Sequence, residues 1–383
     1  MLIGIVLISL LNGCQQNDVQ GNGNDDPAPA QASYTYEQPQ NRGDGWETDS
    51  ILNHGIDEAK LSTMMGKIEK KTYNAVDGIV IVKGGKLVFE AYFDGYDYNN
   101  NPVAYDWNIR HHNASVTKSI VSALIGIAID KGFFDHVDHL IKTSFEEYPD
   151  LDWGDEKDQI RIRHLLNMTS GLYYDESSTH IGSEGNSHYE MNHSPDPIKF
   201  VLEQQMVSAP GEKWNYSSGN TVLLGRMIKR ATGIYIDQFA ENYLFNHLGI
   251  SDYTWNDYET GDIRAHGGLA LRPRDMAKFG QLFLNKGVWN GTQVISADWV
   301  EKSTANQIPI SEGGDYGYSW WLYTFQVGTT SIPTYRGVGW GGQQLIVIPS
   351  LDTVVVITCG NWNNQDDSIQ LFQNEILPSL LSK

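Results

Sequence analysis

Ser115 and Lys118 are the two side chains of this chain whose types and spacing best suit covalent chemistry. A serine hydroxyl is a weak nucleophile until a neighbouring base accepts its proton. Because residues three apart share one face of a helix, Lys118 can approach Ser115. A Ser-x-x-Lys pair is expected roughly once by chance in a chain this long. The pair is therefore a candidate nucleophile and base only if its surroundings support that chemistry.

The sequence around the pair predicts a helix that is buried in a core. Residues 115–131 are apolar on nearly every face. Asn113 stands where an N-cap belongs, and Gly132 is a natural helix stop. Burial and the positive end of the helix dipole both disfavour an ammonium group. We therefore expect the pKa of Lys118 to be lowered toward that of a useful base.

The rest of the pattern predicts an antiparallel sheet that is built from both ends of the chain. Two β-rich runs joined by a Lys-Gly-Gly-Lys turn precede the helix, and further strands close the chain. Helical periodicity dominates the intervening residues 132–300. We predict an α+β fold in which helices flank the sheet and the middle of the chain is a mainly helical insertion. The predicted strands are residues 78–82, 87–93, 329–335, 344–348 and 353–358, and the other predicted helices are residues 198–205, 221–231, 236–248, 273–286 and 368–381.

Composition limits the classes of partner. A hydrophobic content of 40% with 11% aromatic residues is typical of a globular protein, and the net charge of −20 disfavours nucleic acids and anionic lipid surfaces as partners.

Residues 173–197 are polar and contain three histidines, but their spacing matches no zinc signature. We expect this segment to be a lid or substrate-binding loop. We predict a small-molecule substrate, with no metal or cofactor.

The N-terminus resembles a bacterial lipoprotein signal. Residues 1–14 form a short apolar run that ends in Leu-Asn-Gly-Cys, which implies lipidation of Cys14. Residues 15–46 have the composition of a disordered tether, and residues 47–383 form the predicted folded domain. This layout implies a periplasmic or cell-surface protein whose only membrane attachment is the anchor at Cys14. No Lys or Arg precedes the run and Asn12 is unusual, so a true start upstream of Met1 or weaker processing stays open. The other cysteine, Cys359, lies at the end of an apolar run and is predicted to be a small buried residue.

Several short motifs, taken in order, resemble the serine β-lactamase and penicillin-binding-protein-like hydrolases. Residues 47–383 are most similar to the branch with class C β-lactamases, D-alanyl-D-alanine peptidases and esterases, and loosely similar to 6-aminohexanoate-dimer hydrolase. The resemblance implies the β-lactamase/transpeptidase-like fold. The motifs are residues 115–118, 163–172, 214–220, 267–269, 273–277 and 339–343.

The resemblance also implies roles for individual residues. Ser115 would be the nucleophile, Lys118 its proton acceptor, and Tyr216 the group that passes a proton to the leaving group. The oxyanion would lie between the backbone N–H groups of Ser115 and Gln343. The implied oxyanion or substrate-binding residues are Gln343, Trp340, Gly342, Ser218 and Asn220.

Two departures from the family pattern bear on the substrate. Ser218 stands where relatives usually have Asn, and Asn220 lies two residues later, so either side chain could supply that polar contact. Trp340 replaces the Lys or His that leads the third motif in many relatives. A tryptophan offers an apolar wall and one N–H donor but no charge. This favours esters or uncharged amides, unless an arginine such as Arg336 replaces the missing cation.

We therefore predict a serine hydrolase that acts through an acyl-enzyme on Ser115, with esters first and uncharged amides second. One alternative is a β-lactamase or D-alanyl-D-alanine carboxypeptidase that acts on cell-wall-like substrates. Another is an inactive protein of the same fold that binds cell-wall fragments. The sequence leaves the oligomeric state open.

Overall fold

The computed structural model describes residues 34–310, 313–362 and 366–381. Thr35–Lys383 form one compact unit. The expected signal segment, Cys14 and most of the expected tether lie outside the described residues. The unit begins before the predicted boundary at residue 47, because the Tyr36 hydroxyl donates to the Val88 carbonyl at 2.9 Å and the Asp44 carboxylate pairs with Arg274 at 2.7 Å. In the described residues, no helix has the length and apolarity needed to cross a membrane.

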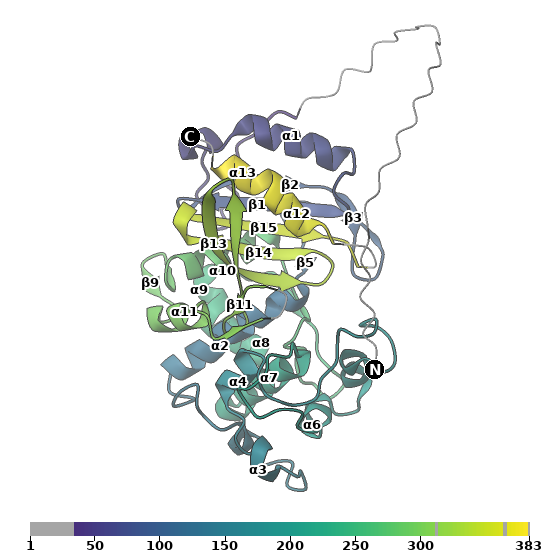
Figure 1. Cartoon of the computed structure of the whole chain (residues 1–383). Coiled ribbons are helices and arrows are strands. Elements are labelled where there is room, and N and C mark those ends of the chain that lie inside the picture. The colour runs from purple at the N-terminus through teal and green to yellow at the C-terminus, as the bar shows by residue number, and fades with distance from the viewer. Residues whose placement is uncertain (1–33, 311–312, 363–365, 382–383) are drawn as a thin grey trace, which may run out of the picture. The chain divides into compact units, whose positions relative to one another are not determined.

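The described part of the chain contains an eight-stranded antiparallel sheet that joins the two ends of the unit (Figure 1). Strand β15, from the end of the chain, lies directly beside β1, and β1 pairs in turn with β2. This arrangement confirms the predicted fold class. In sheet order the strands are β10 (Ile308–Pro309), β11 (Asp315–Tyr316), β12 (Trp321–Val327), β13 (Thr330–Gly339), β14 (Gln343–Ile348), β15 (Thr353–Cys359), β1 (Val76–Lys83) and β2 (Lys86–Tyr92).

The central strands are buried along their whole length because helices cover both faces of the sheet. Every residue of β14 and β15 is buried, as is Cys359 at the end of β15. Helix α10 (Pro273–Leu284) covers one face so closely that a Cβ atom on Gly280 would lie 2.6 Å from Val354. Helices α1 (Glu58–Glu69), α12 (Ser368–Leu371) and α13 (Leu377–Leu380) cover the other face (Figure 1).

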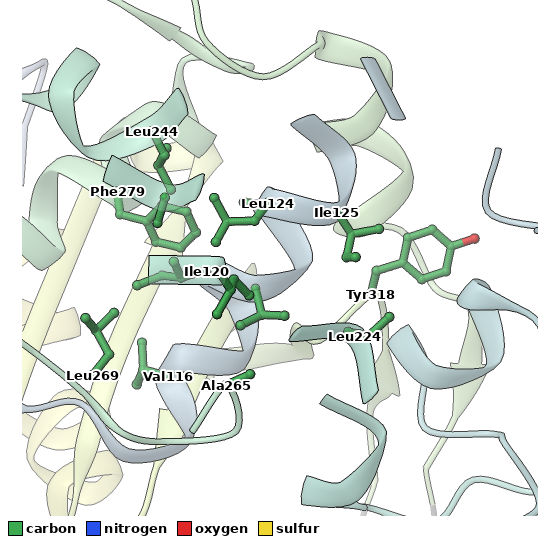
Figure 2. Packing of buried hydrophobic residues seen from close by; sticks show 14 of the residues in the cluster. Val116, Ile120, Leu124, Ile125, Leu224, Leu244, Ala265, Leu269, Phe279 and Tyr318 are labelled. Atoms are coloured by element: carbon green, nitrogen blue, oxygen red, sulfur yellow. The ribbon is translucent and has the colours of Figure 1, made fainter. Parts of the chain in front are cut away.

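The Ser-x-x-Lys segment begins as a 3-10 turn, η2 (Ala114–Val116), and continues as α2 (Thr117–Asp130). Figure 2 shows Val116, Ile120 and Leu124 among the buried hydrophobic residues of the core. Gly132 adopts a φ of +75° just after the helix, as expected of a stop. The predicted N-cap was wrong, because Asn113 has αR backbone angles and its side chain makes no capping hydrogen bond.

A small sheet that the sequence did not predict anchors the chain just before η2. Its order is β5 (His111–His112), β7 (Leu269–Leu271) and β6 (Tyr253–Trp255). The Asn113 N–H extends this pairing by donating to the Leu269 carbonyl at 2.9 Å. The entry to the Ser115 turn is therefore fixed by backbone hydrogen bonds to residues far along the sequence.

The predicted helical middle is confirmed, with shifted boundaries. The helix predicted over residues 221–231 is α7 (Ser218–Thr232), and residues 236–248 form one run whose centre is a π-helical turn. The remaining elements are η1 (Ile51–His54), β3 (Asp94–Tyr96), β4 (Pro102–Ala104), η3 (Ile141–Ser144), α3 (Gly154–Lys157), α4 (Ile162–Leu166), α5 (Ser187–His193), α6 (Pro197–Leu202), α8 (Ile236–Ala240), η4 (Glu241–Phe245), α9 (Asn246–Leu248), β8 (Val288–Trp289), β9 (Thr292–Gln293), α11 (Ala297–Ser303), η5 (Pro349–Leu351) and η6 (Phe372–Ile376).

Candidate active site

Ser115 lies on a strained turn. Ala114, directly before it, has a φ of +46°. A non-glycine residue in this left-handed region costs on the order of 1–2 kcal/mol, which the surrounding structure must supply. The Ala114 N–H donates to the His112 ring at 3.2 Å, and the Val116 N–H donates to the Asn113 carbonyl at 3.1 Å. These contacts hold the backbone so that the Ser115 side chain reaches a surface cavity while its neighbours are buried.

Lys118 is buried beneath Ser115. Its Nζ atom donates to Ser115 Oγ at 2.8 Å and to the His266 carbonyl at 2.8 Å. Burial lowers the pKa of Lys118 from 10.5 to about 8, against an opposing effect of the Glu176 carboxylate. A neutral amine can keep its N–H bond to the carbonyl and turn its lone pair toward the serine hydroxyl. This geometry suits a general base that accepts the Ser115 proton.

Tyr216 lies on the opposite side of the same pair. Its ring centroid is 5.1 Å from Lys118 Nζ. Burial and the Glu176 carboxylate both raise the pKa of Tyr216, while a hydrogen bond with Ser115 acts to lower it. Tyr216 is therefore a neutral phenol at neutral pH. Such a hydroxyl can accept a proton and donate its own, but it is not a phenolate base.

The polar contact near Lys118 is made through Ser218 and an acid that the motifs did not single out. Glu176 accepts the Ser218 N–H at 2.8 Å and the Ser218 hydroxyl at 3.2 Å. Asn220 is fully buried, and its amide nitrogen faces Met168 Sδ at 3.8 Å. Of the two alternatives, Ser218 contacts Glu176, whose carboxylate acts electrostatically on Lys118, whereas the Asn220 amide faces Met168. The sequence marked Glu176 only as part of a polar segment.

The third motif meets the Ser115 turn at Gly339. A Cβ atom there would lie 2.6 Å from the Asn113 carbonyl, 3.2 Å from the Ala114 Cβ and 3.0 Å from the Gln343 Cβ. The structure thus brings the first residue of β14 beside the turn that carries Ser115. The Gln343 amide is buried and donates to the Cys359 carbonyl at 2.6 Å, which fixes the strand end. Gly342 has a φ of +93°, a conformation that glycine adopts without strain.

Trp340 forms part of an aromatic wall, and Arg336 does not replace its missing charge. The Trp340 side chain is 37% exposed and packs edge-on against Tyr98 and Trp362. Successive side chains of a strand point to opposite faces. Gly337 and Gly339 of β13 face the nucleophile turn, so Arg336 belongs to the other face. There its guanidinium lies over the Tyr323 and Phe325 rings, at 5.6 and 5.5 Å.

A cavity of about 250 Å³ opens beside Ser115. Much of its wall comes from residues 180–193, which supports the expected role of the polar segment as a substrate-binding loop. The loop is held by Asn186, whose side chain accepts the His188 N–H at 2.9 Å and donates to the Thr179 carbonyl at 3.1 Å. The lining residues are Tyr98, His112, Ala114, Ser115, His180, Ile181, Gly182, His188, Tyr189, Asn192, His193, Asn256, Arg264, His266, Gly267, Gly268 and Trp340.

The inner histidines of this wall are neutral. Burial lowers the pKa of His112 to about 4 and that of His188 to about 3, and it also lowers the pKa of His266 well below its usual value. The His188 and His266 rings meet edge-to-face at 4.9 Å. Within the described residues, no cluster of three or more His, Cys, Asp or Glu side chains is arranged to hold a metal ion.

The order of the motifs and the geometry around Ser115 agree with a family comparison. The model of the family described as Beta-lactamase matches residues 70–374, which is most of the chain and includes the whole site. The chain belongs to the beta-lactamase family. Membership of this family places the chain among hydrolases and does not by itself specify the substrate.

The proteins to which this chain is similar carry the names of different activities. The chain is 27% identical over 326 residues to the 6-aminohexanoate-dimer hydrolase of Paenarthrobacter ureafaciens, covering 80% of this chain and 78% of that protein. Its fold is similar to that of EstCE1, a hydrolase with promiscuous acyltransferase activity (TM-score 0.66, 12% identity, 87% and 100% of the two chains). It is also similar to the octameric penicillin-binding protein homologue from Pyrococcus abyssi (TM-score 0.64, 19% identity, 84% and 77%). Proteins with different named activities thus share this fold.

Proposed function

We propose that this chain is a serine hydrolase that cleaves carboxylic esters or linear amides through an acyl-enzyme on Ser115. The contact of 2.8 Å between Lys118 Nζ and Ser115 Oγ, made by a buried lysine whose pKa is lowered to about 8, carries this proposal. A buried ammonium that served only stability would be expected to pair with a carboxylate. Here the two partners of Lys118 are a hydroxyl and a carbonyl.

In the proposed reaction, neutral Lys118 accepts the hydroxyl proton as Ser115 Oγ attacks the carbonyl carbon. The resulting oxyanion would be held by the backbone N–H groups of Ser115 and Gln343, which Gly339 keeps close together. Tyr216 would deliver its proton to the leaving alkoxide or amine and take up the proton that Lys118 had accepted from Ser115, so that Lys118 is neutral again. Water would then attack the acyl-enzyme by the same route in reverse, with Lys118 again as the base.

At the third motif, two features favour an ester or linear amide over a β-lactam or a D-alanyl-D-alanine peptide, whose carboxylate that motif binds in many relatives. Trp340 and its aromatic neighbours occupy the third motif without a cation. Arg336, the other candidate for that charge, lies on the far face of β13. This choice agrees with the names of one relative, a 6-aminohexanoate-dimer hydrolase, and of one protein of similar fold, a family VIII carboxylesterase.

Hydrolysis of p-nitrophenyl butyrate by the full chain, wild type and Ser115→Ala side by side, tests the proposal. We expect turnover by the wild type and its loss in the variant, together with labelling of Ser115 by a fluorophosphonate. Equal rates in the two proteins would show that Ser115 is not the nucleophile. Absence of both turnover and labelling would favour a binding protein, and turnover of nitrocefin in place of esters would favour a β-lactamase.

Lipidation of Cys14, which we propose as the surface anchor, would be checked by metabolic labelling with a palmitate analogue.

A further inference from the structure

Arg264 places a positive charge in the wall of the Ser115 cavity. The residue precedes the Gly267–Gly268 motif and lines the same cavity as Ser115. Its side chain is held in place, because Nε donates to the Asp257 carbonyl at 2.9 Å and the guanidinium lies over the Tyr258 ring at 4.7 Å. Nη1 also donates to Asn192 Oδ1 at 3.4 Å. The guanidinium is therefore positioned in advance of any ligand.

The neighbours of Arg264 leave its charge unneutralised. A carbonyl, an amide oxygen and an aromatic ring are all uncharged partners. Among the described residues that line the cavity, none is Asp or Glu, and Arg264 is the one Lys or Arg. The chain as a whole has 47 acidic and 27 basic residues and is therefore negatively charged. The lining of the cavity, in contrast, carries a net positive charge.

The histidines beside Arg264 do not share this charge. His188 and His266 are both near enough to Arg264 and Lys118 that the two cations add to the effect of burial in lowering the pKa values of these rings. At neutral pH the inner wall therefore combines neutral imidazoles with one permanent guanidinium. A guanidinium offers a planar set of N–H donors that matches a carboxylate.

We propose that Arg264 binds a carboxylate carried by the ester or amide substrate, and so determines specificity for anionic substrates. This inference rests on the proposed hydrolase function and replaces the expectation of an uncharged substrate, which was based on Trp340. The anion site lies on the wall formed by residues 256–268, away from the third motif. A carboxylate that enters the cavity would otherwise lose hydration without gaining a partner.

Two pairs of isosteric substrates test the proposal with the full chain. One pair carries the charge on the leaving group (4-carboxyphenyl and 4-carbamoylphenyl butyrate). The other carries it on the acyl group (mono-4-nitrophenyl glutarate and 4-nitrophenyl 4-carbamoylbutanoate). We expect kcat/KM to favour the acid over its amide isostere about 10- to 100-fold in at least one pair, the range of a hydrogen-bonded charge. Arg264→Gln should bring that ratio close to one, and Arg264→Lys should retain part of it.

Arg230→Gln is the matched control. It removes the same charge from an exposed position near the end of α7, where Arg230 pairs with Glu147 at 3.3 Å. This position is about 18 Å along the helix from Ser218. The control should keep the wild-type ratio. If Arg264→Gln does not fold, inhibition of the wild type by glutarate and by glutaramide gives the same comparison.

The outcomes separate this proposal from the one on which it rests. Ser115-dependent turnover without preference for the acid in either pair would overturn the anion site and leave the hydrolase function standing. A preference that survives in Arg264→Gln would also overturn it. Turnover that does not depend on Ser115 would contradict both the proposed hydrolase mechanism and the carboxylate site at Arg264.

Discussion

Two regions meet at the Ser115 cavity, and they are held together in different ways. The floor consists of η2, α2, β13 and β14, and the wall consists of residues 176–193 and 256–268. The floor is fixed by burial, since α2 is buried from Thr117 to Ala128 and β14 along its whole length. The wall loop is fixed by single hydrogen bonds, such as those of Asn186 to His188 and Thr179.

The difference indicates a division of labour between the two regions. Residues whose geometry must not change, the nucleophile, the base and the strand end at Gln343, belong to elements that the core determines. Residues that would touch the variable part of a substrate belong to a polar loop, which can change sequence at little cost to the fold. Changes in the floor should therefore abolish turnover, and changes in the wall should alter substrate preference or affinity.

The largest effect is expected from Lys118→Met in the floor. Removal of a positioned general base typically costs about 10²- to 10⁴-fold, and we expect kcat to fall by about that factor. Lys157→Met is the control, because Lys157 is also buried and donates to a backbone carbonyl, that of Leu202 at 2.7 Å. Steady-state hydrolysis of p-nitrophenyl butyrate measures both variants. A similar loss of kcat in both variants would mean that the removal of any buried lysine lowers turnover, and that the contact of Lys118 with Ser115 has no special role.

Gly339→Ala should have the next largest effect. The new Cβ would lie 2.6 Å from the Asn113 carbonyl, so the Ser115 turn and the end of β13 must move apart. A shift of this kind disturbs the two oxyanion donors, and we expect kcat to fall about 100-fold with the fold retained. Gly337→Ala is the control on the same face of β13, where the nearest atom would be Val116 Cγ1 at 3.0 Å. An equal effect of the two substitutions on kcat would argue against a special role for the Gly339 contact.

The floor was largely predictable from sequence and the wall was not. The apolar runs of β1, β14 and β15 and the periodicity of α2 report burial directly, and the i, i+3 spacing placed Lys118 beside Ser115. The small sheet β5–β7–β6 escaped prediction because strands of two or three residues carry no period. Asn113 does not cap the helix because Ala114, the next residue, has a left-handed backbone conformation. No local sequence pattern predicts that conformation for an alanine. The contact of Glu176 with Ser218 spans 42 residues, so only the fold could bring it to Lys118.

Glu176 lies where the wall meets the floor, and its removal should change the pH profile more than the maximal rate. Lys118 must be neutral to act as a base, so kcat/KM should rise with pH through an apparent pKa near 8. The Glu176 carboxylate raises the pKa of Lys118. Glu176→Gln should therefore shift the profile to lower pH. Because roughly a tenth of a base with that pKa is neutral at pH 7, the gain there should not exceed about tenfold.

Asp175→Asn is the control for this shift. Asp175 is the neighbouring acid, but its carboxylate accepts the Ser177 and Ser178 N–H groups of the loop. The variant should leave the apparent pKa of kcat/KM in place. A profile that moves to higher pH in Glu176→Gln, or that moves equally in both variants, would show that Glu176 does not act on Lys118 through its charge.

The smallest effect is expected from Asn186→Ala in the wall. The substitution removes the N-cap of α5 and the bond to Thr179, which should lower the free energy of unfolding by about 1 kcal/mol. Because α5 presents His188 and Tyr189 to the cavity, KM should rise several-fold while kcat changes little. Ser296→Ala removes the N-cap of α11, a helix of equal length outside the cavity wall. Denaturant unfolding should show a similar loss for the two variants, whereas KM should change only for Asn186→Ala. A fall in kcat as large as that expected for Gly339→Ala would mean that the wall loop also sets the geometry of the reacting groups, and the proposed division between floor and wall would fail.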